Sequence, residues 1–211
     1  MTKHTTITLL IACMSLSSSS QNAITTDSVK VWTDTDRRYL LDNLARSRDE
    51  LIKETKGLTD KQWNFKESPD RWSIKEVTEH ICIWELLLMH EVSRALAAGE
   101  QLDLNKTARP DSIGLNFLME EKPHISVEYT KPFTYSLPMG LNDGKNNVAW
   151  FLKMRNESIG YLTTATENLR SYFLRKGRGN VHQNFISIFA HNDRHLRQIR
   201  KIKAHANYPR G

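Results

Sequence analysis

Hydrophobic residues recur at three- and four-residue steps through most of the chain, which is the period of amphipathic α-helices. The pattern predicts long helices over residues 34–56, 73–98, 147–176 and 184–203. The second helix has the clearest start, because Ser73 and Glu76 have the spacing of a capping box. Asn180 and Gln183 offer a similar start before the last helix. We therefore predict an all-α fold in which four helices pack as a bundle.

A long irregular segment, residues 100–146, separates the second and third predicted helices. Within it, residues 112–121 could form a short helix and residues 125–129 alternate weakly like a strand. A connection of this length makes sense if the second and third helices lie parallel, because the chain must return along the bundle. The predicted architecture is thus a four-helix bundle with a long crossover between helices 2 and 3.

The last predicted helix carries two histidines on its apolar face. Ile188, His191, His195, Ile199 and Ile202 share one side of the helix. Imidazoles four residues apart have Cβ atoms about 5–6 Å apart, which lets both bind one metal ion at about 2.0–2.1 Å. The alternative is a structural or surface-edge pair of histidines, and the spacing alone does not separate the two interpretations.

Composition and charge favour one globular domain. The chain has 211 residues and a formal charge of +6, and its basic residues are scattered along helix faces. We read them as a solvated surface, and nucleic-acid binding is not expected because no recognition motif is present. The sequence contains no run of about 18 apolar residues, so no membrane-spanning helix is predicted.

The amino-terminal segment, residues 1–27, is predicted to be an export signal followed by a flexible tether. A short apolar stretch leads to Leu10-Ile11-Ala12-Cys13 and a serine run, which is similar to the lipobox of a bacterial lipoprotein. Membrane contact is then expected only through a lipid on Cys13. The other interpretations are simple secretion and, if the signal is misread, a cytoplasmic protein. Residues 28–211 form the predicted domain, in which Cys82 is buried and unreactive.

Two further stretches carry a family resemblance. PDRWSIKEVTEHI, residues 69–81, and FAHNDRHLRQI, residues 189–199, together resemble the DinB-like metal-binding superfamily. The resemblance covers about residues 34–205. It implies a four-helix bundle in which a histidine of the second helix joins the pair from the fourth. The matching positions in this sequence are His80, His191 and His195.

The resemblance implies a divalent metal ion, with zinc or nickel favoured by three imidazole ligands. Three protein ligands leave a coordination position open, where a bound water ionises near neutrality or a thiolate binds. The expected function is a metal-dependent hydrolase or thiol-type transferase acting on a small molecule. The alternative is a non-catalytic scaffold lipoprotein that binds metal or a partner, and the family resemblance makes a homodimer plausible.

No catalytic base is assigned. Glu76 is explained by its capping role, Glu79 is expected to point away from His80, and Asp193 is expected to face solvent. The remaining histidines carry less weight: His90 and His182 are expected off the main stripes, His124 lies in the crossover, and His205 is at the tail. The tryptophans are expected to be core or staple residues, not a substrate cage: Trp63, Trp72 and Trp84.

Overall fold

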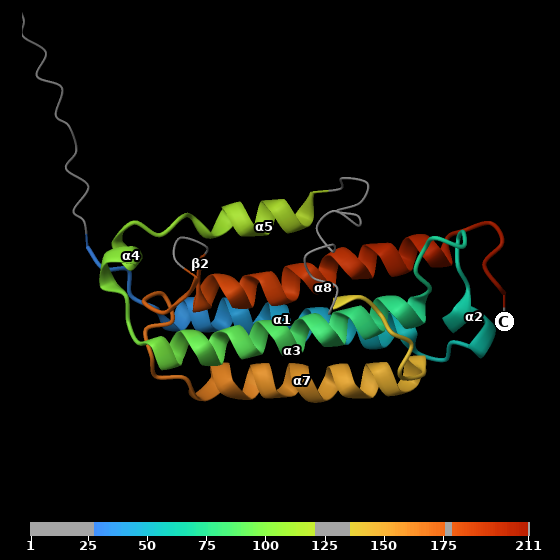
Figure 1. Cartoon of the computed structure of the whole chain (residues 1–211), viewed down its shortest axis with the longest axis horizontal. Coiled ribbons are helices and arrows are strands. Elements are labelled where there is room, and N and C mark those ends of the chain that lie inside the picture. The colour runs from blue at the N-terminus through green and yellow to red at the C-terminus, as the bar shows by residue number, and fades with distance from the viewer. Residues whose placement is uncertain (1–27, 121–135, 176–178, 211) are drawn as a thin grey trace, which may run out of the picture.

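The computed structural model describes residues 28–120, 136–175 and 179–210 (Figure 1), and most of them are helical. The four long helices are α1 (Asp34–Thr55), α3 (Ile74–Ala98), α7 (Gly144–Thr164) and α8 (Val181–Lys203). Three short helices and two short antiparallel strands complete the described part: α2 (Asp60–Asn64), α4 (Leu102–Lys106), α5 (Asp111–Met119), β1 (Phe173–Arg175) and β2 (Gly179–Asn180).

The long helices lie side by side, so that α1 and α3 each pack against both α7 and α8, while α5 lies on the outside of α8 (Figure 1). Two contacts set the direction of α7. The Asn147 side chain donates to the carbonyl of Lys75, and Arg155 bonds Glu85 further along both helices. α3 and α7 therefore run parallel, as the length of the intervening segment predicted.

Local capping explains where the helices begin. Ser73 and Glu76 form the predicted capping box of α3, and Asn180 and Gln183 form that of α8. Gly99 follows α3 with a φ of +82°, a conformation that glycine adopts without steric cost. The predicted boundaries of α1, α3 and α8 thus agree with the structure within a few residues.

The third predicted helix is wrong in its second half. α7 ends at Thr164, and Ala165 has an extended backbone with φ −57° and ψ 131°. Arg37 of α1 donates to the carbonyl oxygens of Leu162 and Ala165, so a side chain from another helix satisfies groups that a continuing helix would have used. Leu169 is nevertheless fully buried. The hydrophobic pattern therefore predicted the burial of this residue correctly, although the chain there forms turns and a strand and not a helix.

A buried ion pair crosses the core. The guanidinium of Arg155 is fully buried and binds both carboxylate oxygens of Glu85, at 2.6 and 2.7 Å. Arg155 also donates to the Ser47 hydroxyl and the Leu44 carbonyl, so its charge and hydrogen-bonding capacity are well satisfied. Cys82 is buried beside this layer, as predicted, and burial raises the pKa of its thiol to about 12.

Several predicted features lie outside the described residues: the export signal with Cys13, the possible strand over residues 125–129, and His124. Within the described ranges, no helix is both long enough and apolar enough to cross a membrane.

Candidate metal centre

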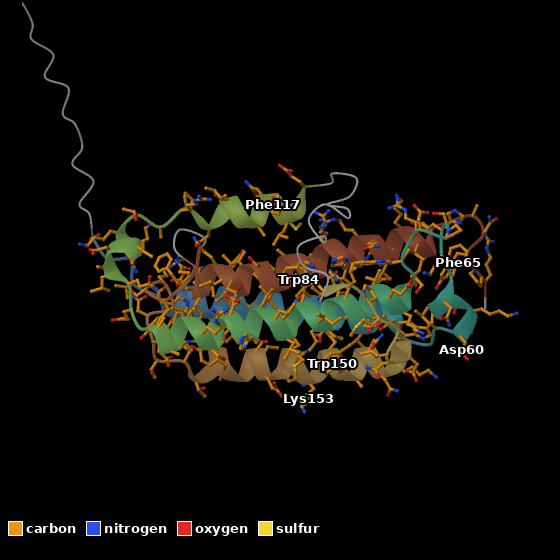
Figure 2. The ribbon with its side chains drawn as sticks, in the orientation of Figure 1. Asp60, Phe65, Trp84, Phe117, Trp150 and Lys153 are labelled. Carbon is orange, nitrogen blue, oxygen red and sulfur yellow. The ribbon has the colours of Figure 1, made fainter. Side chains whose placement is uncertain are left out.

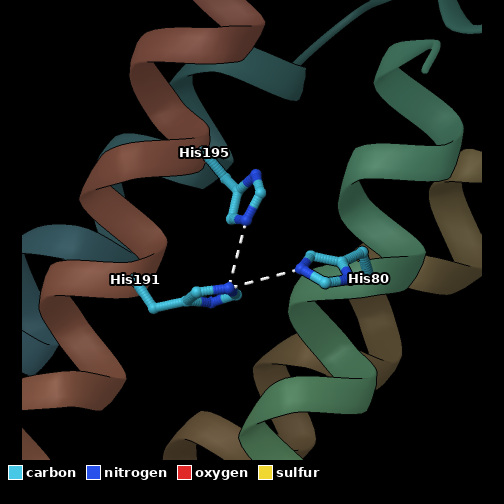
Figure 3. Close-up of side chains that lie close together, drawn as sticks. All are labelled: His80, His191 and His195. Atoms are coloured by element: carbon cyan, nitrogen blue, oxygen red, sulfur yellow. Dashed lines mark hydrogen bonds between the residues drawn. The ribbon is translucent and has the colours of Figure 1, made fainter. Parts of the chain in front are cut away.

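The structure brings together the three histidines that the sequence singled out. His80 comes from α3, while His191 and His195 come from successive turns of α8 (Figure 3). The Nε2 atom of His191 lies 3.3 Å from Nε2 of His80 and 3.1 Å from Nε2 of His195. One ligand atom of each ring lies within 4.8 Å of the others. Two segments far apart in sequence therefore present three ring nitrogens to one point.

The outer nitrogens of two of these rings are held by protein oxygens. His80 Nδ1 lies 2.6 Å from the carbonyl oxygen of Ser136, and His195 Nδ1 lies 2.8 Å from Oε1 of Gln198. Because both oxygens are acceptors, each Nδ1 donates its proton outward, and each Nε2 keeps a free lone pair. Such outer hydrogen bonds are typical of metal-binding histidines, whose orientation they fix.

The three Nε2 atoms of His80, His191 and His195 form an inner triangle, and they do not carry enough protons to hydrogen-bond one another. With Nδ1–H on His80 and His195, their Nε2 atoms can only accept, and a neutral His191 carries at most one proton on Nε2. At least one of the two short N···N contacts then joins two lone pairs. A divalent cation at the centre would remove this conflict. Ligands at about 2.0–2.1 Å around a tetrahedral ion lie about 3.3 Å apart, which matches the two separations from His191 Nε2.

Burial keeps the three rings neutral at neutral pH. His80 and His195 are buried and His191 is partly buried. Burial lowers the pKa of His80 to about 4, although the hydrogen bond to Ser136 opposes the effect. Burial is also the largest cause that lowers the pKa of His191 and His195, and charges of neighbouring side chains add to it. Neutral imidazole is the form that binds metal.

Two tryptophans line the histidine cluster, which the sequence did not predict. The Trp72 ring lies 4.8 Å from that of His80 and stacks on His195 at 6.4 Å between centroids. Trp84 of α3, which is labelled in Figure 2, has its ring centroid 5.2 Å from that of His191. Both tryptophans are only partly buried, whereas Trp63 is a core residue as expected. The aromatic rings lower the local polarity around the cluster.

The acidic residues considered as catalytic bases all bond elsewhere. Glu76 caps α3 and pairs with Lys66. Glu79 is buried and accepts backbone N–H groups of residues 139–141 at 2.9–3.4 Å, so its carboxylate is used by that loop. Asp193 reaches solvent only in part: its side chain is 13% exposed and pairs with the more exposed Arg46 of α1.

A fourth histidine is buried far from the cluster. His182 was expected off the main stripe of α8, but it is 1% exposed. Trp32 Nε1–H donates to its Nδ1, and its Nε2 lies 3.1 Å from Arg170 and 3.2 Å from Asp111. These partners come from distant parts of the chain, so the helical period could not show them. His90 is exposed and His205 lies against Phe65 at the tail.

The three-histidine cluster therefore suits a divalent metal ion in its donor atoms, their spacing and their protonation. Two hollows of about 360 and 440 Å³ lie along α5, and none of the three histidines lines either of them. The histidine cluster and these two hollows are thus separate.

Comparison with known proteins identifies the family. A family model described as the DinB superfamily matches residues 43–199, a span that contains all three clustered histidines. No curated protein and no solved structure matches the chain. The family match covers well over half of the 211 residues. The chain belongs to the DinB superfamily.

Proposed function

We propose that this protein is a DinB-like four-helix bundle in which His80, His191 and His195 hold one divalent metal ion, zinc or nickel. The supporting observation is the inner triangle of Nε2 atoms, at 3.1 and 3.3 Å, with outward-facing Nδ1 atoms on His80 and His195. When bound, such an ion acidifies a water or a thiol in the coordination position that three protein ligands leave open.

We further propose that the protein acts on a small molecule, as a metal-dependent hydrolase or a thiol-type transferase. The chain's own residues would hold the ligand rings in place through Ser136 and Gln198, while Trp72 and Trp84 would keep water away from one side of the reacting groups. Glu76, Glu79 and Asp193 are all bonded to other groups, so proton removal would depend on the ion. A protein that binds metal without turnover is the competing function.

The first experiment measures metal content. Protein purified without a nickel column should contain about one equivalent of zinc or nickel per chain by elemental analysis, and His191→Ala should contain almost none. The matched control is His90→Ala, which removes an exposed histidine of α3 and should leave the metal content unchanged. Wild type without metal, or His191→Ala with normal metal, would contradict the proposed site.

The second experiment tests turnover. Ester, amide and thiol substrates are offered to the metal-loaded protein, and any activity should disappear with a chelator and in His191→Ala. Normal metal binding without turnover across the panel would favour the scaffold function.

Export is a separate part of the proposal, and it depends on residues 1–27 and Cys13. Fatty-acid labelling of the full chain in a bacterial host should occur with Cys13 and fail in Cys13→Ser. Labelling of both proteins, or of neither, would contradict a lipid anchor at that position.

A further inference from the structure

Arg194 occupies the helical turn between the two α8 histidines. It lies three residues after His191 and one before His195, and residues three apart share one side of a helix. The Nη1 atom of Arg194 is buried and has no hydrogen-bond partner among the described residues. The feature is a partly buried guanidinium beside the histidine cluster with unused donors.

The other arginines of α8 are arranged differently. Arg197 donates to the carbonyl oxygens of Leu118 and Met119 at the end of α5, and Arg200 pairs with Glu50 and Glu54 of α1. Arg194 has no comparable carboxylate or carbonyl in the described part of the chain. Burying a charge without a partner costs free energy, and burial lowers the pKa of Arg194 accordingly, with a smaller contribution from Arg197.

Among the described residues, the charges nearest the cluster that have no bonded partner are positive. Three neutral imidazoles do not offset the charge of a divalent ion, and Arg194 adds another positive charge. The acidic side chains nearest in sequence, Glu79 and Asp193, are bonded to other groups. With an ion bound, the described residues would leave both cations uncompensated. An anionic ligand would balance them.

We propose that Arg194 binds the carboxylate of a small anionic substrate whose reacting group lies at the metal ion. The inference rests on the proposed function, and it narrows the substrate class to carboxylates. A guanidinium binds a carboxylate through two parallel N–H···O hydrogen bonds, which fixes the orientation of the substrate as well as its charge. Trp72 and Trp84 would face the apolar part of such a molecule, since their rings contact the histidines.

The test compares two thiols on protein loaded with cobalt(II), whose thiolate absorption band reports binding at the metal. The probes are 3-mercaptopropionate and its neutral amide. Wild type should bind the carboxylate about 10- to 100-fold more tightly than the amide, as expected for hydrogen bonds between charged groups. Arg194→Met should bring this ratio close to one. Lys201→Met removes an exposed positive charge from the same helix and should keep the wild-type ratio.

Each outcome decides between the two proposals. Equal binding of both probes by wild type, or an unchanged ratio in Arg194→Met, would overturn the role of Arg194 and leave the metal site standing. Absence of cobalt from wild type would overturn the metal site and this inference with it. If Arg194→Met does not fold, Arg194→Gln keeps the polar side chain without its charge, and it should lose the preference in the same way.

Discussion

Two histidine environments on α8 show opposite ways of burying an imidazole. His182, in the first turn, has protein partners on both ring nitrogens: Trp32 on one, Arg170 and Asp111 on the other. His191 and His195, further along the same helix, direct Nε2 atoms only at each other and at His80. A ring whose nitrogens are all used by the protein serves the fold. Rings whose lone pairs converge on one point suit the coordination of a cation.

The largest expected effect that tests this contrast is the pH dependence of the metal-free protein. His80 has a pKa of about 4 when folded and about 6.5 when unfolded. Below pH 6.5 the unfolded state binds more protons, so stability is lost as the pH falls toward 4. The shift for His80 alone corresponds to about 3 kcal/mol.

Urea unfolding in the presence of a chelator, followed by circular dichroism at several pH values, measures this loss. His80→Leu should weaken the dependence, because its side chain does not titrate, and the part that is left should come from His191 and His195, whose pKa values are also lowered. An equal free energy of unfolding of the metal-free wild type at pH 6.5 and pH 4 would contradict the lowered pKa of the buried histidines.

The next effect concerns His182. His182→Ala leaves the Trp32 N–H and the Arg170 and Asp111 side chains without one of their partners, which should lower the free energy of unfolding by about 2 kcal/mol. Metal content and metal affinity should stay at wild-type values. Loss of metal from His182→Ala would contradict this contrast, because it would show that His182 also supports the metal site.

The smallest effect concerns the outer hydrogen bond of one ligand. Gln198→Met removes the acceptor of His195 Nδ1–H with little change in side-chain volume. Loss of such a bond should weaken zinc binding about tenfold, measured by competition with a chromophoric chelator, while the thermal unfolding of the metal-free protein changes little. Unaltered zinc affinity would mean that Gln198 does not orient the ring.

The sequence predicted the features that depend on local pattern. Helix starts at Ser73 and Asn180 follow from capping residues that lie three apart, and the burial of Leu169 follows from periodicity. The histidine cluster could be anticipated because two motifs in a fixed order resembled a known family. Gln198 could also have been found, since it lies three residues after His195 on the same side of the helix.

Features that depend on contacts between distant parts of the chain could not be predicted from local sequence pattern. Arg37 ends α7 from another helix, and the Ser136 carbonyl is a backbone group that any residue would supply. The burial of His182 requires Trp32, from a segment that carries no periodic signal. These contacts are set by the packing of the helices, and a single sequence contains no direct record of that packing.

Glu79 and His80 are consecutive, and both hold the far end of the crossover: one binds the amides of residues 139–141, the other the carbonyl of Ser136. A shift of that loop end would therefore turn the imidazole. Insertions or deletions in the crossover would therefore alter the geometry of the cluster while all three histidines stayed the same.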